Sequence, residues 1–164
     1  MIGATAGATI ASIAALLVAT SSGAAKSDDL VVEKLKDGTT LVYAHVAGRD
    51  VAVRFVVRAG GEDDPPGKAG LAHILEHLVF HGTYDAPEGV MFERAWGAGG
   101  SLNAFTTDLA TVFVLDVPTS SFASLTPSFL AMVTSPALPF AQFDREKGVV
   151  GAEAFDRPDI ISVE

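Results

Sequence analysis

Cysteine is absent from the 164 residues of this chain. Its absence excludes disulfide bonds, thiolate metal sites and a cysteine nucleophile. Any metal ion must therefore be held by the nitrogen and oxygen ligands of His, Asp and Glu. Positive charge is also scarce, with 11 Lys and Arg against 20 Asp and Glu and a formal net charge of −9. Because no cluster of Lys and Arg interrupts this acidity, we expect no nucleic-acid partner.

The composition that remains is typical of a folded protein, with 49% hydrophobic and 19% charged residues. This length suffices for one domain with a hydrophobic core, but hardly for two. We expect residues 27–164 to form that domain.

Residues 1–26 differ from the rest in composition. The stretch 10–19 is apolar and the small residues 22–24 suit signal peptidase, which predicts a secretory leader and an exported protein. No Lys or Arg precedes Lys26, so the positive segment usual in such leaders is missing. Two other interpretations stay open: a disordered Ala-rich leader, or an uncleaved anchor shorter than the ~20 residues of a membrane span. Without a signal peptide, the expected location is the cytoplasm.

The pattern of apolar residues predicts the secondary structure. Alternation and β-branched residues predict five strands, at residues 30–35, 40–46, 51–57, 101–105 and 111–117. Helical periodicity predicts four helices, at residues 70–80, 88–96, 120–133 and 141–155. Asp37-Gly38 predicts a hairpin turn, and Pro87 is expected in the first turn of its helix. Strands first and helices interleaved afterwards favour an α+β fold over a regular βαβ repeat.

Three polar residues share one face of the helix predicted at residues 70–80. His73 and His77 are separated by about 40° around the helix axis, and Glu76 falls within the same ~100° arc. Two imidazoles on one helical turn can reach a single Zn²⁺, and the adjacent carboxylate can reach a water on that ion. The competing interpretation is two hydrogen-bonded histidines on an amphipathic helix. A catalytic zinc site also needs a third protein ligand.

The last predicted helix offers carboxylates for that third position. Glu146 and Glu153 are seven positions apart and therefore share one face, with Val149 and Val150 beside them. Carboxylates that share a face with valines are unusual on a purely solvated surface. Periodicity alone also permits exposed charges at the edge of that face.

Three motifs in this order resemble the pitrilysin (insulinase-like) family of zinc peptidases. Residues 70–83 (GLAHILEHLVFHGT) resemble its zinc-site signature, preceded by Gly61 at the family's interval. Residues 99–106 (GGSLNAFT) resemble its substrate-side strand, and residues 146–153 (EKGVVGAE) resemble its second glutamate helix. The resemblance covers residues 30–160, and the motif is inverted relative to the commoner His-Glu-x-x-His zinc peptidases.

The resemblance implies roles for these residues and a fold for the chain. It implies a zinc ion on His73, His77 and Glu153, with Glu76 as general base. Glu146 would be a second carboxylate of the catalytic set that orients or supports the site. The implied fold is a mostly antiparallel sheet with helices packed on one face.

A peptide or small protein is the substrate that the resemblance implies. It would pair with an edge strand at Asn103 and Ala104. A second, similar domain or subunit is the other expected partner, and we expect residues 27–164 to be truncated at the C-terminal end of the domain. The expected activity is that of a zinc metalloendopeptidase which, on its own, binds zinc but cleaves peptides poorly. The alternative is a non-catalytic subunit of the same fold that binds peptides or assists assembly.

Several conspicuous residues are assigned no function from the sequence. A single histidine lies in a loop or at the surface more often than in a functional site, which we expect for His45 and His81. Phe92 and Trp96 at helical spacing are expected in the core. Thr106 has no base at a readable spacing and is expected to be structural.

Overall fold

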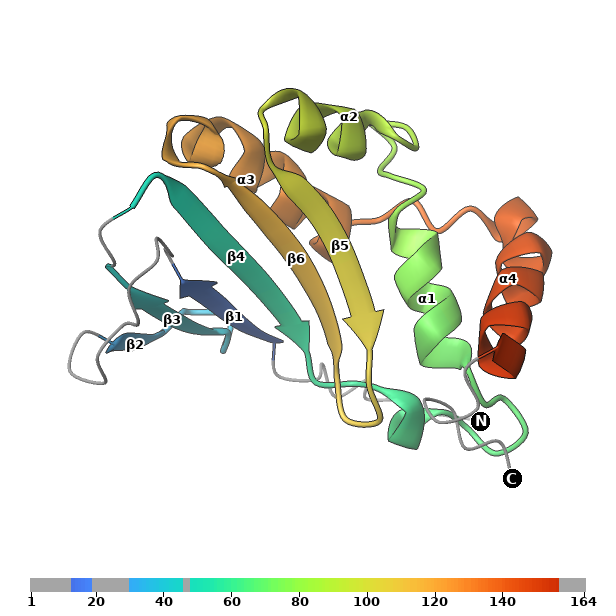
Figure 1. The fold of residues 1–164 in the computed structure, drawn as a ribbon. Helices are drawn as coiled ribbons and strands as arrows, with labels where there is room; N and C mark the ends of the chain where they lie inside the picture. The colour runs from blue at the N-terminus through green and yellow to red at the C-terminus, as the bar shows by residue number, and fades with distance from the viewer. Residues whose placement is uncertain (1–12, 19–29, 46–47, 157–164) are drawn as a thin grey trace, which may run out of the picture.

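One six-stranded sheet, with helices against it, makes up the fold (Figure 1). The structure is a computed structural model and describes residues 13–18, 30–45 and 48–156. The strands are β1 (Ile13–Val18), β2 (Leu30–Lys34), β3 (Thr40–Ala44), β4 (Asp50–Val57), β5 (Ser101–Thr106) and β6 (Thr111–Pro118). The helices are α1 (Leu71–Val79), α2 (Val90–Gly97), α3 (Thr119–Thr134) and α4 (Phe143–Asp156), with 3₁₀ turns η2 (Gly61–Asp63) and η3 (Phe140–Gln142).

The strand order is β2-β3-β1-β4-β6-β5, and every pair is antiparallel except β1 with β3. All five strands and all four helices expected from the sequence are present, with ends shifted by no more than two residues. The expected α+β fold with a mostly antiparallel sheet is thereby confirmed. Pro87 was expected inside a helix, but α2 begins only after Gly89, and Pro87 instead pairs with Gly82 in an isolated β-bridge.

Strand β1 was not expected, because it lies within residues 1–26, which the sequence predicts to be a leader. It pairs in register with β3 on one side and with β4 on the other. A chain cleaved after residue 24 would lack β1, so the cleaved leader and this strand describe two different forms of the chain. The cleaved leader stays a prediction.

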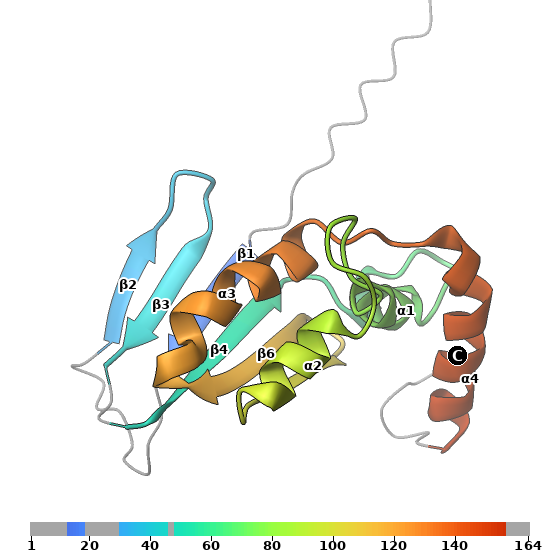
Figure 2. The ribbon, with the colours of Figure 1, turned by 90° about the horizontal axis from the view of Figure 1, so that it is seen from above.

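Alternation along β6 explains which face of the sheet is covered. Thr111, Phe113, Leu115 and Val117 are buried, whereas the residues between them are only partly covered. The three apolar ones, Phe113, Leu115 and Val117, pack into one core with residues of α1, α2 and α3. Seen from above, α2 and α3 lie along the same side of the sheet, and α1 and α4 lie beyond its β5 edge (Figure 2). Among the described residues, no helix is both long and apolar enough to span a bilayer.

The loop before α1 fixes where that helix begins. The Asp64 carboxylate accepts hydrogen bonds from the backbone N–H groups of Gly70, Leu71 and Ala72, at 2.6, 3.1 and 2.8 Å. These N–H groups have no partner within the helix, so a carboxylate at this end satisfies them and interacts favourably with the helix dipole. Gly60 packs so closely on the β5–β6 turn that a Cβ atom would meet the backbone of Thr107. The loop is therefore tied to the sheet as well as to α1.

Phe129 on α3 is expected to contribute strongly to stability, because its side chain is 0% exposed in the main core. Phe129→Ala should lower the free energy of unfolding by about 3–5 kcal/mol, since it leaves a cavity. Urea denaturation measures this change. The control is Phe140→Ala, because Phe140 is 89% exposed and its loss should cost less than about 1 kcal/mol. Equal effects of the two substitutions would contradict this description of the core.

Candidate metal centre

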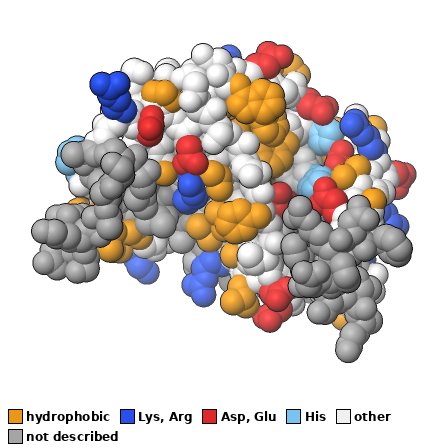
Figure 3. All heavy atoms as spheres, viewed as in Figure 1, with side chains coloured by type: hydrophobic (Ala, Val, Ile, Leu, Met, Phe, Trp, Pro, Cys, Tyr) orange, Lys and Arg blue, Asp and Glu red, His pale blue; other side chains and the backbone are white. Residues whose placement is uncertain are grey.

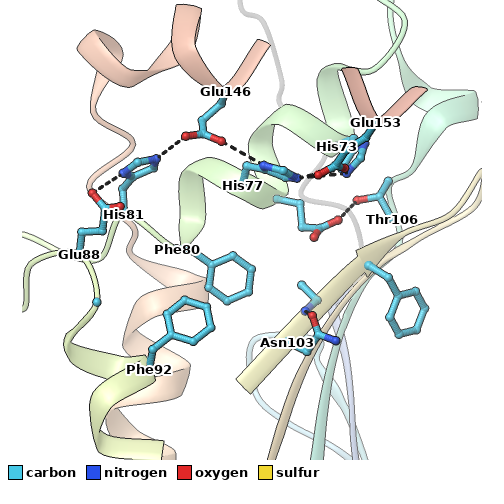
Figure 4. A pocket seen from close by; sticks show the side chains of 14 residues that line it. His73, His77, Phe80, His81, Glu88, Phe92, Asn103, Thr106, Glu146 and Glu153 are labelled. Atoms are coloured by element: carbon cyan, nitrogen blue, oxygen red, sulfur yellow. Dashed lines mark hydrogen bonds and ion pairs between the residues drawn. The ribbon is translucent and has the colours of Figure 1, made fainter. Parts of the chain in front are cut away.

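Helix α1 lies between the sheet and α4, and a small apolar contact holds α4 against it. Val79 of α1 belongs to the main core, whereas Ile74 and Leu78 pack against Val150 of α4. Phe143 at the start of α4 covers the same contact. This packing turns Glu146 and Glu153 toward the histidines of α1 (Figure 4).

Three ligand atoms of the expected types converge between α1 and α4. His73 Nε2 lies 3.2 Å from His77 Nε2 and 3.3 Å from Glu153 Oε2, and His77 Nε2 lies 3.8 Å from the same oxygen. Ligand atoms at ~2.0–2.1 Å around a tetrahedral zinc ion are about 3.3–3.4 Å apart. Two of the three separations match this spacing and the third, 3.8 Å, is longer, so the cluster approximates the ligand geometry of a zinc ion. Without a shared proton or a cation, the lone pairs of these atoms would face one another.

Glu146 fixes the orientation of His77. Its Oε2 accepts a hydrogen bond of 3.0 Å from His77 Nδ1, and its side chain is almost fully buried. Since Nδ1 carries the proton in this bond, Nε2 keeps its lone pair toward the cluster, as a metal ligand requires. Burial raises the pKa of Glu146, but hydrogen bonds from His77 and His81 and the charge of their rings outweigh it and hold this pKa below its usual value.

Glu76 faces the sheet from the buried side of α1. One of its oxygens, Oε2, accepts a hydrogen bond of 2.6 Å from Thr106 Oγ1 at the end of β5. The bond leaves Oε1 to interact with a water or a substrate. Thr106 is thus more than the structural residue expected, because its hydroxyl anchors a buried carboxylate beside the cluster.

The β5 edge of the sheet, which pairs with no other strand among the described residues, runs along the same cavity. Strand β5 is the last strand of the sheet, and Asn103 Oδ1 accepts from the backbone N–H of Ala104, which therefore points away from β6. Outward backbone groups recur at every second residue of an antiparallel strand, here Leu102, Ala104 and Thr106. A cavity of ≈ 560 Å³ connects this edge to the cluster and is also lined by Phe80 and Phe92. In the space-filling view, histidine and acidic side chains gather over α1 and α4, with hydrophobic ones beside them (Figure 3).

The structure brings together all the site residues expected from the sequence, since each of His73, Glu76, His77, Asn103, Ala104, Glu146 and Glu153 lines this cavity. His45 is exposed as expected. His81 lies in the turn after α1, one of the two places expected for it, but its side chain is 6% exposed and hydrogen-bonded rather than at the surface. Trp96 is 64% exposed and not in the core, whereas Phe92 packs against the core and lines the cavity.

An α+β domain with a two-histidine, one-glutamate cluster, a buried carboxylate and an edge strand beside them defines a metallopeptidase-like protein. The sequence model described as Insulinase (Peptidase family M16) matches residues 40–156. The chain therefore belongs to this insulinase family, as its three motifs predict.

Relatives and solved structures agree with this assignment. The chain is 41% identical over 105 residues to the coenzyme PQQ synthesis protein F of Pseudomonas protegens, covering 62% of this chain and 12% of that protein. It is 30% identical over 132 residues to an uncharacterised zinc protease of Rickettsia bellii, covering 78% of this chain and 32% of the relative. The crystal structure of a protease from Helicobacter pylori superposes with a TM-score of 0.74 at 26% identity, over 83% of this chain and 32% of that one. The chain thus spans at most about a third of these proteins.

The bond from Thr106 to Glu76 yields a stability prediction. Thr106→Val keeps the shape of the side chain but removes the hydroxyl, so a buried carboxylate loses a donor. The free energy of unfolding of the metal-free chain should fall by about 1.5–3 kcal/mol, the usual range for a hydrogen bond to a charged group. Thr134→Val is the control, because this exposed hydroxyl bonds only a backbone carbonyl. An equal loss in the control would argue against a special role of the Thr106 bond.

Proposed function

We propose that this chain is the metal-binding part of a zinc metalloendopeptidase. The observation that carries the proposal is the triangle of His73 Nε2, His77 Nε2 and Glu153 Oε2, whose sides of 3.2–3.8 Å suit one tetrahedral ion. Three protein ligands leave a fourth position for water, which is the arrangement of catalytic zinc sites.

The roles of the protein groups follow from where each one lies. A bound zinc ion would lower the pKa of a water molecule and polarise the carbonyl of the scissile bond. Glu76, held by Thr106 through one oxygen, would accept the proton of that water with the other oxygen and later deliver it to the leaving amine. Glu146 would keep His77 in the tautomer that presents Nε2 to the ion.

The substrate in this proposal is a peptide in an extended conformation. Its backbone would add to the free edge of β5 by hydrogen bonds to Ala104 and its outward-facing neighbours, with Asn103 beside it. The apolar wall of Phe80 and Phe92 would contact side chains of the peptide. Such pairing selects for extended shape more than for sequence.

A second domain completes the proposed enzyme. The family members reported above are about three to eight times as long as the matched segment. We infer that a similar domain or subunit covers the peptide and that the isolated chain binds zinc but cleaves slowly. If residues 1–26 act as a leader, the enzyme works after export.

Zinc binding is the first prediction of this proposal. The chain should bind one Zn²⁺, and Glu153→Ala should weaken binding by at least about 100-fold, because losing a ligand costs more than losing an outer-shell partner. Metal analysis and competition with a chelator measure both quantities. The control Glu93→Ala removes an exposed carboxylate from α2 and should change nothing. A wild-type chain that binds no zinc would overturn the proposal.

Peptide cleavage is the second prediction. Glu76→Gln should keep the zinc but lower chelator-sensitive cleavage by about 10²–10⁴-fold, since it removes a general base. Cleavage of an unstructured peptide is measured with the chain alone and with a complementing second domain, beside Glu93→Gln as the control. If the wild type retains zinc but cleaves no peptide, either alone or with the second domain, the alternative of a peptide-binding subunit is favoured.

A further inference from the structure

His81 is a buried histidine outside the three-atom cluster. It lies in the turn after α1, and both of its ring nitrogens face carboxylates (Figure 4). Nε2 lies 3.1 Å from Glu146 Oε1, and Nδ1 lies 2.9 Å from Glu88 Oε2. Because Glu146 stands between His81 and His77, His81 is not a candidate ligand of the same ion.

The two contacts of His81 determine how its ring can be used. Ionised carboxylates only accept hydrogen bonds, so the ring satisfies both neighbours only when it donates from both nitrogens. A buried ring with this pairing is held in one orientation, because turning it would break two charge-assisted bonds. Glu88, which precedes α2, thereby ties the start of that helix to the turn after α1.

His81 also completes the hydrogen bonding of Glu146. His77 engages Oε2 of this carboxylate, and His81 engages Oε1. With one oxygen held, the carboxylate plane could still rotate about its last bond. With both held, the plane is fixed, and so is the direction in which Oε2 meets His77 Nδ1. Arg145 approaches Oε1 only to 3.9 Å from an exposed position, so it does not replace His81.

We propose that His81 is a positioning residue for the metal centre, acting through Glu146 on His77, with Glu88 fixing its own ring. The inference rests on the proposed zinc site and adds a residue to it. In the series Glu88–His81–Glu146–His77, the groups that support one ligand come from three parts of the fold: α4, the turn after α1 and the turn before α2. Outer-shell partners of this kind orient the ligand and raise its basicity.

The test measures zinc affinity of the whole chain by competition with a chelator. His81→Leu should bind zinc about 10-fold more weakly, near the lower end of the effect of outer-shell partners. His45→Leu, which removes an exposed histidine, should bind as the wild type does. His81→Gln keeps one donor toward Glu146 and should recover part of the loss. Thermal unfolding of the metal-free variants identifies any that fail to fold.

A double-mutant cycle distinguishes positioning from general stabilisation. If His81 acts through Glu146, His81→Leu should weaken zinc binding by less than about twofold when Glu146→Gln is already present, because coupled residues are not additive. The absorption spectrum of the Co²⁺-loaded chain should also change in His81→Leu and not in His45→Leu. Should His81→Leu fail to fold, Glu88→Ala replaces it, since this side chain is 57% exposed and its loss should weaken zinc binding less than the loss of His81 does.

Each outcome decides between the two proposals. If the wild type binds zinc and His81→Leu binds it equally tightly, only the role of His81 is overturned. The same holds for Glu88→Ala where it replaces that variant. Full additivity in the cycle would overturn the path through Glu146. A wild-type chain without zinc affinity would overturn the proposed function and this inference together.

Discussion

The packing of α4 against α1 is the contact on which the site depends. Val150 lies against Ile74 and Leu78, and these three residues form an apolar cluster separate from the main core. Glu146 and Glu153 lie one turn on either side of Val150, so docking this residue brings both carboxylates to the histidines. A few apolar contacts thus hold charged groups of two distant segments together.

Hydrogen bonds stabilise the buried carboxylates within this contact. Glu76 and Glu146 are buried, and buried carboxylates are tolerated where they are paired or hydrogen-bonded. Thr106 donates a hydrogen bond to Glu76, and the imidazoles of His77 and His81 donate to Glu146. Glu153, whose side chain is 50% exposed, stays on the side of the cluster that faces solvent.

Most of the fold could be predicted because its elements carry strong local patterns. The alternation along residues 111–117 and the helical spacing of residues 70–80 correspond closely to β6 and α1. Local signals failed where a long-range partner decides the conformation. Strand β1 depends on β3 and β4 for its pairing, and Pro87 pairs with Gly82 in an isolated β-bridge.

The residues of the candidate site could be predicted from the sequence, but the hydrogen bonds between them could not. Two histidines and a glutamate on one helical turn are visible in the sequence, because their spacing is set by the geometry of the helix itself. His81 was expected in a loop or at the surface with no function, and Thr106 was expected to be merely structural. Their partners, Glu146 and Glu76, lie on other elements, and no periodicity within one element reports such a contact.

The sequence by itself determined the types of ligand, since a chain without cysteine can offer a metal only nitrogen and oxygen. It also determined which residues share a helical face. Only the tertiary structure decided that Glu153 reaches His73 and His77, that Trp96 is exposed, and that β5 lies at the edge of the described sheet. The physical reason is that helical and strand periodicity arise from neighbouring residues, whereas convergence of distant side chains arises from packing of the whole domain.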